Sequence, residues 1–155
     1  MEIRTWKASN RTWGDAAVDG LLYGVAAGLV MALFLVCAGL LRGQSWVAML
    51  GQFDPGLGAR PMIGLLTHLA VASVYGAVFG VLWRVGARLL RSLPVWAAGL
   101  LFGLAMWLVA VLVASTRGPA AGGWLSGIPP LEFALAHGVY GLALGWLSTR
   151  IHTSG

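Results

Sequence analysis

Two histidines, His68 and His137, are the residues of this chain whose type and placement suit chemistry. Each follows a proline, Pro61 or Pro130, by seven residues and lies inside a long apolar run. An ionisable side chain in an apolar helix is costly, and it is read first as a functional candidate. Two imidazoles that face each other between helices can ligate the iron of haem b axially or hold a metal ion. We therefore take this pair as the candidate cofactor site.

Three interpretations of the pair stay open from the sequence. In the simplest, each imidazole hydrogen-bonds a neighbouring main-chain or hydroxyl group and pins two helices together. In the second, the pair binds haem b or a metal ion, although two histidines are too few for zinc without further ligands such as Glu132. In the third, the histidines line a solute or ion path with Asp15 and Asp19, two carboxylates that also suit the dipole at a helix start.

The elements that must position these residues are four long apolar helices. The chain has 155 residues, of which 59% are hydrophobic and 10% are charged, whereas soluble domains carry about 25% charged residues. Its apolar runs are long enough to cross ~30 Å of hydrocarbon. We predict an all-α membrane protein, a bundle of four transmembrane helices over about 16–42, 61–84, 94–115 and 130–150. Residues 1–14 form a cytoplasmic or interfacial tail, and residues 15–155 form one domain.

Basic residues are distributed unevenly between the two sides of this bundle. Seven of the ten fall on one side and three on the other: Arg4, Lys7, Arg11, Arg84, Arg88, Arg91 and Arg150 against Arg42, Arg60 and Arg117. By the positive-inside rule, the first side is cytoplasmic and holds both termini. We read the net charge of +5 as this topology signal in a bacterial cytoplasmic membrane, in contact with lipid, and not as a nucleic-acid surface.

The two halves of the chain resemble each other. Residues 20–26 align with 99–105, and the Pro–His–Gly pattern relates 61–76 to 130–145, which predicts two parallel helical-hairpin repeats. Small residues recur at a spacing of four, and such stripes permit close helix approach where lipid supplies no hydrophobic drive. We expect helix packing at nine glycines: Gly20, Gly24, Gly28, Gly76, Gly80, Gly99, Gly103, Gly141 and Gly145.

The segments 137–145 and 74–80 resemble those of uncharacterised bacterial four-helix integral membrane proteins with a duplicated two-helix hairpin. That resemblance implies a fold and no activity. The sequence contains no metalloprotease motif, phosphate-binding loop or cysteine pair. We therefore predict a non-catalytic accessory or scaffold subunit, packed against other subunits of an electron-transfer or photosynthetic type of membrane complex or against its own copies. A haem b or metal-binding protein and a small-solute or ion transporter are the alternatives.

Overall fold

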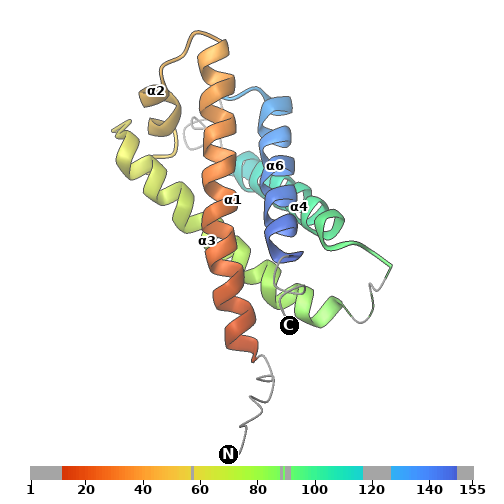
Figure 1. Cartoon of the computed structure of the whole chain (residues 1–155). Helices are drawn as coiled ribbons and strands as arrows, with labels where there is room; N and C mark the ends of the chain where they lie inside the picture. The colour runs from red at the N-terminus through yellow and green to blue at the C-terminus, as the bar shows by residue number, and fades with distance from the viewer. Residues whose placement is uncertain (1–11, 57, 88, 90–91, 117–126, 150–155) are drawn as a thin grey trace, which may run out of the picture.

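The computed structural model describes residues 12–56, 58–87, 89, 92–116 and 127–149, and all regular structure in these ranges is helical. The helices are α1 (Trp13–Leu41), α2 (Trp46–Gly51), α3 (Pro61–Gly86), α4 (Val95–Thr116) and α6 (Pro130–Thr149) (Figure 1). By length and composition, α1, α3 and α4 are able to cross a membrane. The prediction of an all-helical chain is confirmed for the described residues, and these three helices are candidates to span a membrane.

The fourth long helix, α6, forms over the predicted residues but is less apolar than the others. Its 20 residues include Glu132, His137 and three glycines. It is also the helix with the most enclosed surface, because it lies against both α1 and α4. A helix covered by protein on two sides needs fewer apolar side chains than one surrounded by lipid.

Local signals explain where the long helices begin. Thr12 caps α1: its hydroxyl accepts from the Asp15 N–H at 3.1 Å, and the Asp15 carboxylate accepts from the Thr12 N–H at 2.7 Å. This reciprocal capping box starts α1 three residues before the predicted position. The helices α3 and α6 each begin with a proline, whose missing N–H costs nothing at a first helical position.

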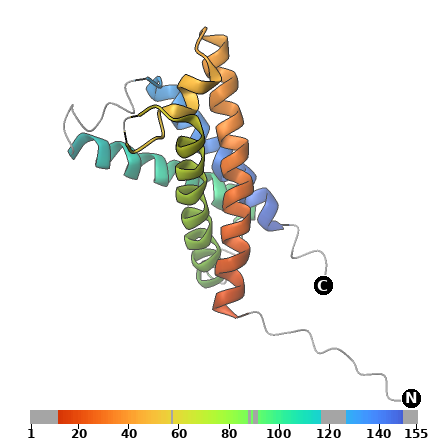
Figure 2. The same ribbon diagram turned by 90° about the vertical axis from the view of Figure 1, so that its left-hand side faces the viewer.

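The long helices form two antiparallel pairs, α1 with α3 and α4 with α6, and α1 also packs against α6. In Figure 1, the starts of α3 and α6 lie at the same end of the molecule as the end of α1. Figure 2 shows α4 running across the direction of α1 and α3 instead of alongside them. The arrangement is therefore more open than four aligned helices.

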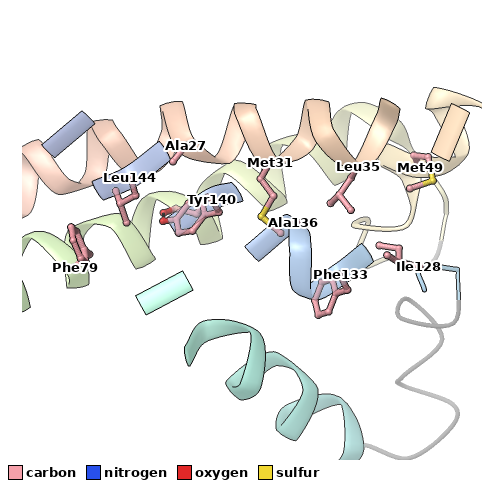
Figure 3. Close-up of a cluster of buried hydrophobic side chains, with 11 residues drawn as sticks. Ala27, Met31, Leu35, Met49, Phe79, Ile128, Phe133, Ala136, Tyr140 and Leu144 are labelled. Carbon is pink, nitrogen blue, oxygen red and sulfur yellow. Dashed lines mark hydrogen bonds between the residues drawn. The ribbon is translucent and has the colours of Figure 1, made fainter. Parts of the chain in front are cut away.

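The core lies between α1 and α6 (Figure 3). Ala27, Met31 and Leu35 recur at a spacing of four along α1, and on α6 Tyr140 and Leu144 are fully buried. These side chains form one contiguous cluster with residues of α2 and α3. Most other large apolar side chains of the long helices are exposed, which suits helices surrounded by lipid.

Polar contacts join the segments at each end of the molecule. At the end where α3 and α6 begin, Arg42 pairs with Glu132 at 2.9 Å and so connects the end of α1 to the start of α6. At the opposite end, the Arg84 guanidinium lies 5.1 Å from the ring centroid of Trp13. Residues 1–11 and 150–155, which hold most of the predicted cytoplasmic charge, lie outside the described residues.

Candidate functional site

The first pair of helices is held together by direct backbone contact along a glycine seam. A Cβ atom on Gly24 of α1 would lie 2.5 Å from the Ala72 oxygen and 2.9 Å from the Gly76 Cα of α3. Gly20 faces Gly76 in the same way, and Gly80 faces Ala16 and Gly20. Any side chain at these glycines would push the two backbones apart.

The second pair has a matching seam. A Cβ atom on Gly99 of α4 would meet the Gly141 oxygen and, at 2.7 Å, the Gly145 Cα of α6. A Cβ atom on Gly103 would meet the His137 oxygen and, at 2.9 Å, the Gly141 Cα. The seam thus brings the backbone of α4 directly against the turn of α6 that carries His137.

The contacts of the two seams correspond, but with an offset of one helical turn from the sequence alignment of α1 with α4. Gly24 meets the oxygen of Ala72 and the Cα of Gly76, while Gly99 meets the same atoms of Gly141 and Gly145. By these contacts Gly99 corresponds to Gly24, although the sequence alignment pairs it with Gly20. Ala72 and Gly141 are the twelfth residues of α3 and α6, so the offset lies on the α1 and α4 side.

His68 lies in the seam between α3 and α1. Its Nε2 atom is 3.0 Å from the Gly28 oxygen of α1, and its ring stacks at 4.9 Å, tilted by 37°, on the ring of Phe53. Because a carbonyl oxygen only accepts, Nε2 must carry the proton and donate it. In the neutral imidazole, Nδ1 then holds a lone pair.

His137 is buried in α6 beside Phe133. Its Nδ1 atom is 2.9 Å from the Phe133 oxygen one turn earlier, and the two rings make an edge contact at 4.5 Å. By the same reasoning Nδ1 donates its proton, which leaves the lone pair on Nε2. Among the described residues, neither lone-pair nitrogen of the two histidines makes a hydrogen bond.

The two histidines lie at the same level of the molecule. Each is the eighth residue of its helix, and both helices begin at the same end (Figure 1). One turn further along, the Tyr140 hydroxyl donates to the Ala72 oxygen at 2.7 Å and ties α6 to α3. The structure therefore places this predicted pair at one level, on two helices that the Tyr140 hydrogen bond connects.

The residues around the pair do not fit haem b in this arrangement. The sequence suggests that Ala72 and Gly141, one turn beyond the histidines, leave room for a flat macrocycle. The Cβ of Ala72 instead lies beside Gly28 and its oxygen accepts from Tyr140, while Gly141 lies against Gly99 and Gly103. The Nε2 atom of His68, the nitrogen that usually ligates haem iron, faces the Gly28 oxygen.

The acidic residues proposed for a transport path lie elsewhere. The Asp15 carboxylate belongs to the capping box of α1. Asp15 is thirteen residues before Gly28, the residue of α1 that meets His68, so about 20 Å of helix separates this carboxylate from the histidines. Among the described residues, no cluster of three or more His, Cys, Asp or Glu suits a metal ion.

The sequence does not predict the polar contacts of Asp54, which lies in the loop between α2 and α3. Asp54, whose side chain is fully buried, binds the Arg60 guanidinium at 2.9 Å and accepts from the Gly56 and Arg60 main-chain N–H groups. Hydrogen bonds from Arg60, followed by those from the main chain, hold the pKa of Asp54 well below its ordinary value. The turn signal at 54–56 marks this loop, but only the fold shows that Asp54 organises it.

Comparisons with known protein families, with curated proteins and with solved structures find no match to this chain.

Proposed function

We propose that this chain is a non-catalytic membrane subunit that packs against a larger membrane assembly through the outward side of α4. The observation that carries the proposal is the incomplete cover of α4 within the chain. This helix meets α6 along Gly99 and Gly103, while its other side exposes a line of leucines, Leu101, Leu108 and Leu112, each by 59% or more.

Exposed leucines alone also suit a surface that faces lipid. The direction of α4 therefore supports a subunit contact more than its composition does. Helix tilt in a membrane is set by packing against neighbouring helices and by interfacial anchors. Within this chain, α4 has one well-packed neighbour and crosses the direction of α1 and α3 (Figure 2). A neighbouring subunit on the leucine side would support it along its length.

The proposal includes the finer architecture predicted from sequence. All four long helices lie in the bilayer of a bacterial cytoplasmic membrane, and the basic end of α1 and α3 faces the cytoplasm. The two helix pairs are parallel repeats of one hairpin, an idea supported by their matching seams. An electron-transfer or photosynthetic complex is the class of assembly that suits such a small polytopic subunit.

The test compares two sets of leucines on one protein. Native membranes are solubilised in mild detergent, and the particle that contains the tagged chain is sized and its components identified by mass spectrometry. We expect a particle larger than the chain, which is lost in the variant L101A/L108A/L112A on α4. The matched control, L29A/L33A/L40A on the exposed side of α1, is expected to retain it.

Two results would overturn this function. One is a wild-type chain that migrates alone, or only with copies of itself, when it is expressed at its native level. The other is equal loss of the large particle in the α1 control variant, since that would show general destabilisation and no role for the α4 face. Helix content measured by circular dichroism checks that both variants fold.

A further inference from the structure

The short helix α2 lies beside the ends of two long helices, at the end of the molecule where α3 and α6 begin (Figure 1). A Cβ atom on Gly39, in the last turn of α1, would lie 2.5 Å from the Met49 sulfur of α2. A Cβ atom on Gly64, in the first turn of α3, would meet the Leu50 main-chain oxygen. With 29 residues, α1 is about 44 Å long, as long as a bilayer with its headgroups is thick. These contacts therefore hold α2 at the headgroup level of such a bilayer.

The two sides of α2 differ in what they contact. Met49 is fully buried, whereas Trp46 is 53% and Val47 is 40% exposed. An indole combines a large apolar body with one N–H donor, and tryptophan is enriched where the headgroups meet the acyl chains. Both long helices also expose apolar side chains at this end, at Leu40, Leu41, Met62 and Leu66. The lipid-facing surface of α1 and α3 thus extends to α2.

Arg60, directly before α3, adds a positive charge that suits a lipid phosphate. The buried Asp54 carboxylate holds one edge of the guanidinium, through Nε at 2.9 Å and Nη2 at 3.3 Å. The Arg60 side chain is 57% exposed, and its Nη1 atom makes no hydrogen bond with the described residues. A guanidinium binds phosphate through such an open edge, and here Asp54 has already oriented it. The preceding residue, Ala59, lies against Gly51 and so places Arg60 beside α2.

We propose that α2 and Arg60 form a phospholipid-headgroup surface, in which Trp46 and Val47 lie at the boundary with the acyl chains and Arg60 Nη1 donates to a lipid phosphate. Because Asp54 and Arg60 together carry no net charge, we expect little preference for anionic over zwitterionic lipids. This inference rests on the placement of the long helices in a bilayer, and not on a partner subunit.

The depth of Trp46 is measured on the full chain in phosphatidylcholine vesicles. The lipids carry bromine on their acyl chains, either near the headgroups or near the bilayer centre, and the Trp46 signal is the difference in emission between the wild type and W46F. We expect the shallow bromines to quench it about twofold more strongly than the deep ones, as for an indole at the headgroup level. The control is W107F, since Trp107 lies in the middle of α4 and should show no such preference.

Two results would overturn the placement of α2. Quenching of Trp46 by aqueous iodide and by neither set of bromines would place α2 in water. Protection from iodide and from both sets of bromines would place protein, such as a second copy of the chain, on this face. Neither result bears on the α4 face, which the particle-size experiment tests separately.

A second measurement addresses Arg60. Solid-state NMR in the same vesicles measures how strongly lipid phosphorus dephases the guanidinium carbon signal, with R60K subtracted from the wild type. Lysine keeps a positive charge beside Asp54. The control is R42K, because Arg42 already uses Nη1 for the Gly127 oxygen and Nη2 for Glu132. We expect dephasing at Arg60 and less at Arg42; no dephasing at Arg60, or as much at Arg42, would overturn the phosphate contact.

Discussion

The hydroxyl of Tyr140 on α6 donates a hydrogen bond to the main-chain oxygen of Ala72 on α3, across 2.7 Å. This oxygen also lies 2.5 Å from the position that a Cβ atom of Gly24 on α1 would take, so three helices meet at one carbonyl group. The bond is the described side-chain contact that ties α6 to α3 at the level of the candidate site. Its loss should loosen the two halves of the chain without disturbing either seam.

Replacing Tyr140 by phenylalanine tests this contact. We expect Y140F to lower the free energy of unfolding by about 0.6–1.5 kcal/mol, the usual contribution of one hydrogen bond between membrane helices. Reversible unfolding in mixed micelles measures it. Y75F is the control, because the Tyr75 hydroxyl makes no hydrogen bond with the described residues, and its stability should stay at the wild-type value. Equal losses in both variants would contradict the assignment.

Glycine to alanine changes in α6 distinguish the effect of close contact between helices from the effect of intrinsic helix propensity. At Gly141 an added methyl group would meet the Gly99 oxygen and, at 3.1 Å, the Gly103 Cα, so G141A should cost about 1–3 kcal/mol through overpacking. At Gly138, on the same helix and also buried, the methyl group would meet only a Leu100 methyl at 3.6 Å. G138A should therefore be neutral or slightly stabilising.

Thermal stability in detergent measures both glycine variants. A G138A protein that is destabilised as much as G141A would show that the seam is not the reason for glycine in this helix.

The ion pair between Arg42 and Glu132 is expected to couple the two halves weakly. Arg42 is 31% exposed and Glu132 13%, so solvent screens part of the attraction, and a double-mutant cycle should give about 0.5–1 kcal/mol. R42Q, E132Q and the double variant supply the cycle, measured by unfolding at low and at high salt. The coupling should shrink as salt rises. A coupling that is zero at low salt would show that the pair adds nothing.

The Asp54 carboxylate makes stability depend on pH in the acid range. Because Arg60 and two main-chain N–H groups lower its pKa in the folded chain, its contribution is complete above the ordinary value of about 3.9 and declines as pH falls below it. We expect D54N to be less stable than the wild type at pH 7. The difference should stay constant down to about pH 4 and narrow as the pH falls further, as followed by thermal unfolding. A difference that stays constant as the pH falls further would contradict the role of ionised Asp54.

The sequence predicts the long helices well and their mutual register poorly. Pro61 and Pro130 mark helix starts because proline suits a first position, and apolar length alone identifies three spans. Small residues spaced by four, however, present a similar surface after a shift of one turn. The pattern that aligns Gly20 with Gly99 therefore does not determine that Gly24 and Gly99 make equivalent contacts.

For the candidate site too, the sequence predicts the positions of the residues along their helices but not the contacts that they make. Equal spacing from a proline predicts that His68 and His137 lie at one level, but not which nitrogen each ring uses or that Ala72 is covered by Tyr140. The ion pair of Arg42 with Glu132 joins residues 90 positions apart and leaves no local signal. The sequence allows Asp15 to be either a transport residue or a helix-start residue, and the capping box shows the second role.

The modest apolar character of α6 has a consequence for how this chain enters a membrane. Three helices that are long and apolar enough to cross a membrane precede it during synthesis. With Glu132, His137 and its glycines, α6 gains less from lipid and more from the surfaces that α1 and α4 present. Its insertion is thus expected to await its neighbours and to depend on whether the earlier helices have been placed correctly.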